Sequence, residues 1–353
     1  MNNLNLFILL LAFICTSCGT KQNQISPKEG SSTLPLSSIG KEPLTRIALG
    51  SCNRQDQPQD MWAHIIENDP QLWIWLGDNI YGDSEDMEVM KKKYDLQMSH
   101  PEYQALLRQC PIIGIWDDHD YGVNDGDKSY PMKAASKELM LDFLDVPEGA
   151  EVRKRPGAYQ SFEFGPKDQL VKIMLLDARS FRDELTKETV NNQRQYAANQ
   201  NGDVLGEAQW TWLEKELSGS KAKVHIIGCG IQFIPEEHRF EKWANFPAAR
   251  QRLFDLLVAN KVERPILLSG DRHIGEISKI DLPGLKQAVY EMTSSGLTHS
   301  YEKAKESNRY RQGPLVVNKN FGVINIDWTS TAPEVELTIK GIGNKVYSQL
   351  ILE

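Results

Sequence analysis

Residues 72–81 read LWIWLGDNIY, five apolar residues followed at once by glycine, aspartate and asparagine. A short apolar run bounded by a turn residue is typical of a strand that is buried on both faces, as in a parallel sheet. The same change from apolar to polar recurs in residues 46–52 (RIALGSC), 112–120 (IIGIWDDHD) and 265–273 (PILLSGDRH). Because ligand sites of open α/β sheets lie at the carboxyl ends of the strands, these stretches predict an α/β fold with a site at that edge.

Outward from these stretches, strand-like apolar runs alternate with segments whose apolar residues recur every three or four positions, as in α/β proteins. Near the C-terminus, apolar and polar residues alternate strictly, which predicts half-buried antiparallel strands. We therefore expect one mixed α/β domain over residues 44–353. The expected strands are 46–50, 72–76, 112–116, 171–176, 224–227, 265–269, 323–328 and 335–339, and the expected helices are 59–68, 87–107, 134–144, 207–217 and 248–260.

The composition is that of a folded globular protein, with 40% hydrophobic and 25% charged residues among 353. The formal net charge is −8. Binding to a nucleic-acid backbone depends on clustered Lys and Arg, and the sequence shows no such cluster. We therefore expect no nucleic acid as a dedicated partner. A small anionic substrate would need local positive charge from metal ions or a few arginines.

The N-terminal residues predict export. Residues 6–14 form an apolar run that is too short to span a bilayer but suits a signal peptide. Residues 15–19, CTSCG, resemble a bacterial lipobox in which Cys18 is lipidated. We expect a lipoprotein signal peptide over residues 1–18 and a flexible tether over residues 19–43. The mature protein would be periplasmic or lipid-anchored to the outer membrane. Ordinary signal-peptide cleavage is the alternative, because residues 1–5 carry no Lys or Arg.

The polar residues that follow the strands are of metal-binding types. Taken singly, each has a plain structural explanation, since an aspartate can cap a helix and a cysteine can fill a core. Taken together, several carboxylates at one sheet edge would repel one another, and cations would remove that cost. Carboxylate, imidazole, thiolate and phenolate donors suit a site of two or more ions better than a structural zinc site. The candidate ligands are Cys52, Asp78, Tyr81, Asp117, Asp118, Asp271 and His273.

The spacing of Asp78 and Tyr81 adds a geometric condition. Residues three apart on a strand point to opposite faces, so these two can share an ion only if the chain turns between them. Gly77 and Gly82 flank the segment and would permit that turn.

In this order, the motifs resemble those of the metallophosphoesterase superfamily, which follow successive strands and hold a two-metal centre. The closer similarity is to the PhoD-like alkaline phosphatases and phosphodiesterases, and it covers residues 44–328. The motifs are Ser51-Cys52, in place of the superfamily's usual first Asp-x-His, together with GDNIY (77–81), WDDHD (116–120), LDARSFR (176–182), LGEAQW (205–210) and GDRH (270–273).

The resemblance implies a four-layer αββα sandwich with a metal centre in which Asp78 bridges ions. Cys52 and Tyr81 would bind a ferric ion. The implied ions are Fe3+ and Ca2+, with Mn2+, Zn2+ or Mg2+ as other possibilities. Gln232 alone can be carried over from the Asn-Gln pair that some members have, because Ile231 precedes it here. The carboxylates expected to complete the site are Asp117, Asp118 and Asp271.

We hypothesise that the protein is an exported phosphoester hydrolase in which a metal-activated water attacks phosphorus in line. His119 would protonate or stabilise the leaving oxygen, and a neighbouring carboxylate from Asp117, Asp118 or Asp120 would orient its ring. His273 is a second candidate acid. The candidate catalytic residues are therefore His119, Asp120 and His273.

Other polar residues of the motifs are candidates for holding the substrate. A guanidinium group can bind phosphate through two hydrogen bonds, although for Arg179 a structural salt bridge is an equally good interpretation. His299 is expected to line the pocket. The candidate substrate-binding residues are Arg54, Arg179, Arg272, Gln232 and Asn79, for a small phosphorylated substrate.

Two alternatives belong to other functional classes. One is a nuclease, or a hydrolase of another ester, built on the same metal centre. The other is a surface binding lipoprotein that has the fold without turnover. The presence of His119 beside the metal-type residues disfavours the second, because a binding protein needs no acid there.

Overall fold

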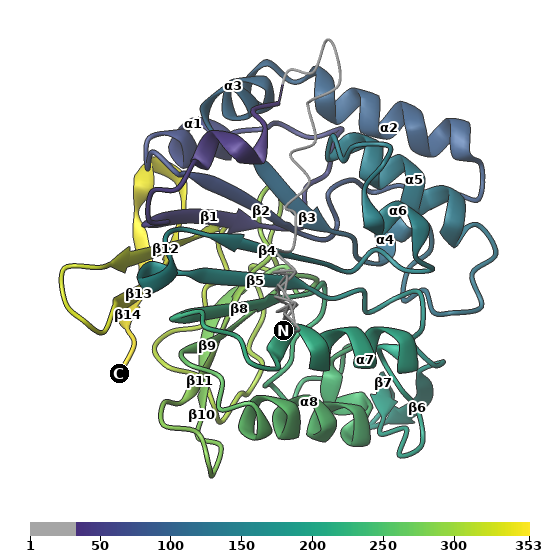
Figure 1. Cartoon of the computed structure of the whole chain (residues 1–353). Helices are drawn as coiled ribbons and strands as arrows, with labels where there is room; N and C mark the ends of the chain where they lie inside the picture. Colours follow the sequence, from purple (N-terminus) through teal and green to yellow (C-terminus); the bar gives the residue numbers. More distant parts are fainter. Residues whose placement is uncertain (1–32) are drawn as a thin grey trace, which may run out of the picture.

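The computed structural model describes residues 33–353, and these form two six-stranded sheets, a two-stranded hairpin and surrounding helices (Figure 1). The first sheet contains, in spatial order, β14 (Val346–Ile351), β13 (Glu334–Lys340), β12 (Phe321–Asp327), β1 (Arg46–Gly50), β2 (Leu72–Leu76) and β3 (Ile112–Ile115). The second contains β10 (Gly275–Ile280), β11 (Val289–Ser294), β9 (Pro265–Ser269), β8 (Val224–Gly228), β5 (Val171–Leu175) and β4 (Gln160–Phe164). The hairpin joins β6 (Thr186–Val190) to β7 (Gln193–Ala197).

Both sheets are mixed. β1, β2 and β3 are parallel, whereas β12, β13 and β14 are antiparallel to their neighbours. In the second sheet β5, β8, β9 and β11 are parallel, and β4 and β10 are antiparallel edge strands. The predicted α/β class, with mixed sheets and C-terminal antiparallel strands, is confirmed.

The helices lie on the outer sides of the two sheets. In Figure 1, α1, α2, α3 and α5 lie above the first sheet, and α7 and α8 lie below the second. The helices are α1 (Met61–Ile66), α2 (Met87–Ser99), α3 (Pro101–Gln109), α4 (Asp118–Tyr121), α5 (Lys133–Phe143), α6 (Glu151–Lys154), α7 (Gly206–Leu217) and α8 (Pro247–Ala259), with short 3₁₀ turns at Leu36–Ile39, Lys167–Gln169, Trp243–Asn245 and Ile342–Asn344.

The continuous apolar strands are explained by burial of both their faces. In β5, Ile173 and Leu175 belong to the core that also contains β1 and β2, whereas Met174 belongs to a second core with Trp210 of α7 and Leu253 of α8. Successive residues of a strand point to opposite faces, so each face of β5 needs apolar side chains.

Most expected elements are present within one or two residues of their predicted bounds, but the single helix over 87–107 is wrong. The structure has α2 and α3 instead, separated by His100, whose φ of −67° and ψ of 120° are extended. Pro101 begins α3, and proline disfavours the helical conformation in the residue before it. The sequence analysis also missed the short helices α4 and α6 and the strands β4, β6, β7, β10, β11 and β14.

The predicted signal peptide and Cys18 lie outside the described residues. Of the predicted tether, residues 33–43 are described, and two of them contact the fold: Leu34 N–H donates to Leu107 O at 3.1 Å, and Ile39 is buried in the first core. Within residues 33–353, no helix is both long enough and apolar enough to cross a membrane.

Candidate metal centre

The carboxyl ends of β1, β2, β3 and β9 bring metal-type side chains from both sheets into one cluster. Three sets of possible ligand atoms each lie within 4.8 Å of one another. Because Asp78 and Asp118 each belong to two sets, the sets form one continuous cluster. The sets are Cys52, Asp78 and His273; Asp78, Asp118 and His119; and Asp117, Asp118 and Asp271.

The turns after these strands have an uncommon backbone conformation. Cys52, Asp78, Asp271 and His273 have positive φ angles of 59°, 49°, 62° and 53°. Positive φ is uncommon for residues other than glycine and is concentrated at functional sites. The turn at Asp78 also returns the next side chains toward the cluster, so that Tyr81 Oη lies 3.4 Å from Asp78 Oδ2. The chain therefore turns where sharing of an ion would require it.

One end of the cluster, the thiol–phenol group, contains Cys52, Asp78, Tyr81, His273 and His299. Cys52 Sγ and Tyr81 Oη both donate to Asp78 Oδ2 at 3.4 Å. Tyr81 Oη also lies 2.9 Å from His273 Nε2 and 3.1 Å from His299 Nε2. The structure thus brings these expected ligands together and places a second imidazole, that of His299, beside them.

The other end, the carboxylate group, contains Asp117, Asp118 and Asp271. Asp117 Oδ1 accepts a hydrogen bond from Arg179 Nε at 2.7 Å, and Asp118 Oδ2 accepts one from Asp125 N at 2.7 Å. Among residues 33–353, no hydrogen-bond donor reaches the buried atoms Asp117 Oδ2 and Asp118 Oδ1. A buried carboxylate oxygen without a partner is costly, and a cation would satisfy it.

Asp78 connects the two ends of the cluster. Its Oδ2 faces Cys52 and Tyr81, and its Oδ1 accepts a long hydrogen bond of 3.4 Å from His119 N. Its ligand atoms also lie within 4.8 Å of those of Asp118. Asp78 therefore has possible ligand neighbours at both ends of the cluster, which is the position a bridging ligand requires.

Without bound cations, the surroundings of the thiol–phenol group oppose ionisation of its side chains. Burial raises the pKa of Cys52 well above its ordinary value, and the charges of Asp78 and Asp271 add to the effect. Burial also raises the pKa of Tyr81 and that of Asp78. Bound cations would favour the ionised forms that these side chains need in order to act as ligands.

In the carboxylate group the pKa values shift in different directions. Burial raises the pKa of Asp117 despite Arg179, and it raises the pKa of Asp271 to about 7. Burial has the same tendency at Asp118, but the positive charges of His119 and Arg179 outweigh it and lower the pKa to about 2. These buried carboxylates and their open oxygens fit hard cations, which prefer oxygen ligands.

His119 lies at the rim of the cluster and has a carboxylate partner that the sequence analysis did not name. Its Nδ1 hydrogen-bonds Asp83 Oδ1 at 2.7 Å, and its ring centroid lies 4.1 Å from that of Tyr81. Burial opposes protonation, but the carboxylates of Asp118, Asp78 and Asp83 raise the pKa to about 11. In this structure Asp83 orients the ring, not Asp117, Asp118 or Asp120, so that expectation is corrected.

Asp120, a candidate catalytic residue, is fully buried and holds backbone instead. Its carboxylate accepts hydrogen bonds from the N–H groups of Asp117 at 2.7 Å and of Asp78 and Asn79 at 3.2 Å. It therefore connects the turn after β2 to the turn after β3. In the described residues, Asp120 makes no hydrogen bond with the ring of His119.

The three candidate arginines have different surroundings. Arg179 is fully buried and forms ion pairs with Asp117 and Glu241, so the salt-bridge interpretation holds and its role as a phosphate clamp is corrected. Arg272 is also buried, bonded to Glu306 at 2.5 Å. Arg54 is the accessible one, with a side chain that is 42% exposed, and its guanidinium lies 5.2 Å from the Tyr81 ring centroid.

The two candidate amides are buried in the fold. Gln232 Nε2 donates to Glu276 and Thr293, both at 2.8 Å. Its amide therefore binds side chains of the second sheet and does not face a substrate. Asn79 Nδ2 donates to Ile115 O at 3.1 Å, behind the turn that carries Asp78. Neither amide is exposed, which corrects their assignment as substrate-binding residues.

Two residues of the site were missed by the sequence analysis. Asp83 follows the GDNIY motif closely, and a carboxylate at a glycine turn beside candidate ligands is a pattern that could have identified it. Glu241 has no such local pattern, since it lies in a long segment between β8 and α8 and reaches the site through Arg179 and Arg182.

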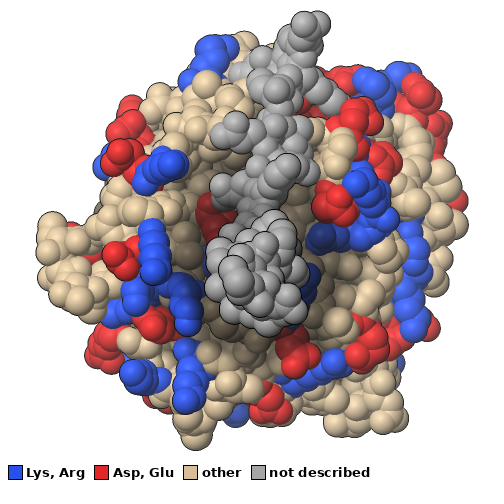
Figure 2. All heavy atoms as spheres, viewed as in Figure 1, with Lys and Arg blue, Asp and Glu red and all other residues tan. Residues whose placement is uncertain are grey.

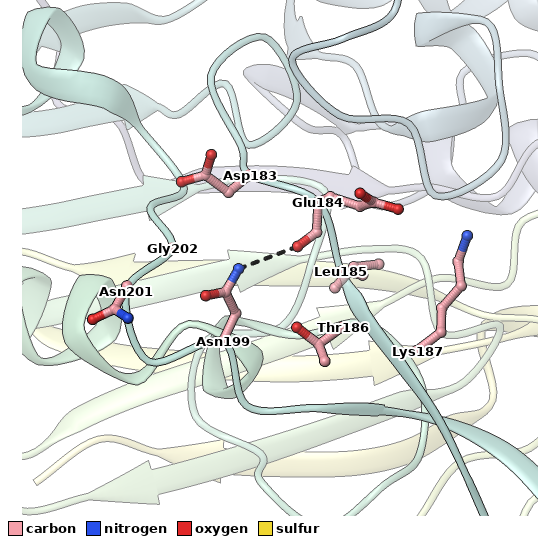
Figure 3. Close-up of a pocket in the computed structure, with 8 residues that line it drawn as sticks. All are labelled: Asp183, Glu184, Leu185, Thr186, Lys187, Asn199, Asn201 and Gly202. Atoms are coloured by element: carbon pink, nitrogen blue, oxygen red, sulfur yellow. Dashed lines mark hydrogen bonds between the residues drawn. The ribbon is translucent and has the colours of Figure 1, made fainter.

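Among residues 33–353, the groups of side chains that could hold a metal ion all belong to the cluster. A hollow of about 590 Å³ lies between β6 and residues 199–202, where Asn199 donates to Glu184 O (Figure 3), and none of its lining residues belongs to the cluster. In Figure 2, Lys and Arg side chains alternate with Asp and Glu around this face of the described residues.

Comparison with known proteins gives a family and several similar folds. Residues 47–337 match the family of PhoD-like phosphatases. The chain is 23% identical over 318 residues to alkaline phosphatase D of Bacillus subtilis (strain 168), a match that covers 77% of this chain and 52% of that protein. This chain therefore spans about half the length of that relative, as the 52% coverage shows.

Solved structures show the same fold. A structure of PhoD superposes with a TM-score of 0.69 at 18% identity and covers 88% of this chain and 69% of that one. A dimetal phosphatase from Danio rerio gives 0.56 at 14% identity, covering 88% and 99%. GAP50 of Plasmodium, an anchor in the inner membrane complex, gives 0.57 at 11%, covering 88% and 89%.

Proposed function

Because the chain belongs to the PhoD-like phosphatase family, we propose that it is a metal-dependent phosphoester hydrolase whose active site is the cluster around Asp78. The observation that carries the proposal is the shared position of Asp78, which belongs both to the set with Cys52 and His273 and to the set with Asp118 and His119. Two adjoining sets of donors around a shared carboxylate suit a centre of two ions.

The two ends of the cluster suit different ions. Thiolate, phenolate and carboxylate donors together would stabilise a trivalent ion, for which we propose Fe3+, with Cys52, Asp78, Tyr81 and His273 as ligands. The carboxylate group offers oxygen alone, for which we propose Ca2+. Mn2+, Zn2+ and Mg2+ remain the other candidates.

Bound ions would polarise the phosphoryl group and activate water for in-line attack. The residues of the chain then have separate tasks. His119, at the rim with Asp83 on its Nδ1, leaves Nε2 to give a proton to the leaving oxygen. Arg54, beside Tyr81 and partly exposed, is placed to bind a phosphoryl oxygen, and its present partner is the exposed carboxylate of Asp56.

The substrate we propose is a small phosphorylated molecule. A net charge of −8 and the mixed charges visible in Figure 2 support this over a nucleic-acid backbone, which would need a continuous basic surface. We further propose that the protein is exported and reaches the outer membrane or the periplasm. The support for this is the apolar run of residues 6–14 and the CTSCG stretch at 15–19.

The test is reconstitution of metal-free protein. After removal of metals with a chelator, hydrolysis of p-nitrophenyl phosphate and of bis(p-nitrophenyl) phosphate should be absent, and addition of Fe3+ with Ca2+ should restore it. The ratio of the two rates defines the preference for monoesters or diesters. A protein that binds these ions and hydrolyses neither ester, nor any other phosphoester in a panel, would show that the proposal is wrong.

A further inference from the structure

A buried set of ion pairs connects the carboxylate group to the segment after β8. Glu241, in that segment, has a side chain that is 1% exposed. Its Oε2 accepts a hydrogen bond from Arg179 Nη1 at 2.7 Å, and its Oε1 lies 2.8 Å from Arg182 Nε. Both arginine side chains are 0% exposed. One carboxylate therefore holds two guanidinium groups, and each of these leads to a different residue of the metal cluster.

The first connection runs through Arg179 to Asp117. Arg179 Nε and Nη2 lie 2.7 Å and 2.6 Å from the same oxygen, Asp117 Oδ1. The guanidinium is planar and rigid, so fixing its Nη1 on Glu241 also fixes the direction of these two nitrogens. Asp117 can then turn only Oδ2 toward Asp118 and Asp271, and this is the oxygen that no donor from residues 33–353 reaches.

The second connection runs through Arg182 to Asp118. Arg182 Nη2 donates to the carbonyl oxygens of Asp125 and Gly126, both at 2.6 Å. This holds Asp125 at a positive φ of 55°, and its N–H then donates to Asp118 Oδ2 at 2.7 Å. Asp118 Oδ1 is left directed to the cluster. A strained residue held in this way indicates that the orientation of its N–H matters.

We infer that Glu241 is a positioning residue for a hard cation at the carboxylate group. Through the two arginines it directs one oxygen of Asp117 and one of Asp118 into the cluster, without contacting the ion. This inference rests on the proposed metal centre and adds a residue that sets the affinity of one end. Within residues 33–353, Glu241 and the two arginines make no hydrogen bond or ion pair with Cys52, Tyr81 or His273. The effect of Glu241 should therefore be confined to the carboxylate group.

The experiment measures Ca2+ binding to metal-stripped protein by calorimetric titration, together with the ion content of the thiol–phenol group by metal analysis and visible absorbance. Glu241→Gln keeps the shape of the side chain and removes its charge. Its Kd for Ca2+ should rise about 10- to 100-fold, as for other partners of metal ligands, while the thiol–phenol group keeps its ion. Glu236→Gln is the matched control. Glu236 lies in the same segment and pairs with Arg250 at 2.9 Å, outside this set of ion pairs, so its Kd should not change.

A purely structural role would give other results. If Glu241→Gln lowers the melting temperature but leaves the Kd for Ca2+ unchanged, or loses both ions equally, the inference is overturned. Should that variant not fold, Arg182→Lys decides, because lysine keeps the charge but lacks the planar fork with which Arg182 places separate nitrogens on Glu241 and on the two carbonyl oxygens. An unchanged Ca2+ affinity in a folded Arg182→Lys protein would equally overturn the inference, and a weakened one with the other ion retained would support it.

The test of Glu241 does not depend on whether the protein hydrolyses a phosphoester. Wild-type protein that binds Ca2+ but hydrolyses no phosphoester would refute the proposed function and leave the role of Glu241 testable by titration. Wild-type protein that is active, with a Glu241→Gln variant of the same Ca2+ affinity, would refute the inference alone. Wild-type protein that binds neither Ca2+, Mn2+ nor Mg2+ would refute both.

Discussion

Asp78 and His119 adjoin one another in the cluster, yet their surroundings give them different tasks. Asp78 is 1% exposed and faces donors on both sides, whereas His119 lies at the rim with Asp83 on its Nδ1. In the proposed function, Asp78 as a bridging carboxylate would act on the ions, and the imidazole of His119 would act on the proton of the leaving group. Substitutions at the two positions should therefore differ in metal content as well as in rate.

We expect Asp78→Asn to lose metal and activity together, because an amide carries no charge and cannot bridge two cations well. His119→Ala should keep most of its metal while turnover falls by about 10²–10⁴-fold, the range for loss of a general acid. Metal analysis and steady-state kinetics on both variants measure the difference. Equal metal loss in the two would assign His119 as a ligand instead of an acid.

Tyr81 should report on the ion of the thiol–phenol group. Phenolate and thiolate bound to ferric iron absorb visible light, so the purified protein should be coloured, and Tyr81→Phe should shift or bleach the band. Tyr301→Phe is a suitable control, because Tyr301 is 47% exposed whereas Tyr81 is 6% exposed. A colourless protein that is fully active with Zn2+ or Mn2+ alone would rule out the proposed iron and leave the hydrolase proposal in place.

At the scale of the elements, the turns after the strands determine the geometry of the cluster. Gly77 follows β2 with a φ of 87°, and a Cβ atom there would lie 2.3 Å from Asp117 Cβ and 2.7 Å from Asp117 N. The turns after β2 and β3 are therefore in direct contact, and only glycine allows this approach. This close contact places Asp78 and Asp117 in the same cluster.

Gly77→Ala should consequently damage both stability and metal binding. The control is Gly219→Ala, since Gly219 has a φ of 69° but nothing within 4 Å of the added Cβ. The control should lose about 1–2 kcal/mol of unfolding free energy from the left-handed backbone alone. Gly77→Ala should lose more and should also bind less metal, as measured by thermal denaturation and metal analysis. Equal losses of stability in both variants, with normal metal content, would contradict the expectation.

At the scale of the whole molecule, the cluster draws its residues from both sheets. Cys52, Asp78 and Asp117 follow strands of the first sheet, whereas Asp271 and His273 follow β9 of the second. Ions bound there would connect the sheets, in addition to the apolar core between them. A ligand that binds only the folded state stabilises that state according to its concentration.

Chelation should therefore lower the melting temperature of the protein, and added Ca2+ should raise it progressively with concentration. Scanning calorimetry of stripped and reloaded protein measures this shift. For the Asp78→Asn variant the shift should be much smaller, because the shared ligand is lost. A melting temperature that is the same with and without ions would argue against a cluster that holds the sheets together.

Attachment to a membrane is also a property of the whole molecule, and it depends on residues outside those described. If Cys18 is lipidated, the mature protein should partition into detergent, and Cys18→Ala should yield a soluble or unprocessed form. Cys15→Ala is the control, because Cys15 precedes the expected cleavage point and is removed with the signal peptide. Unchanged membrane association of Cys18→Ala would speak for another mode of attachment.

The sequence by itself determined the α/β class, the positions of the strands that lead into the cluster and the ligand types at their ends, because these depend on local patterns of apolar residues and on the polar residues that follow them. It also determined the turn expected between Asp78 and Tyr81, from two flanking glycines. The break before Pro101 was missed although proline is itself a local signal, because the regular spacing of apolar residues on both sides suggested one helix.

Only the tertiary structure decided what each charged side chain contacts. Asp83, not Asp120, orients His119, and Arg179 is buried against Asp117 and Glu241 instead of facing a substrate. These partners come from segments far apart in the chain, and 62 positions separate Arg179 from each of its two carboxylates. A motif specifies which residue type follows a strand, but a contact at such a separation depends on how the two sheets pack, which no local pattern specifies.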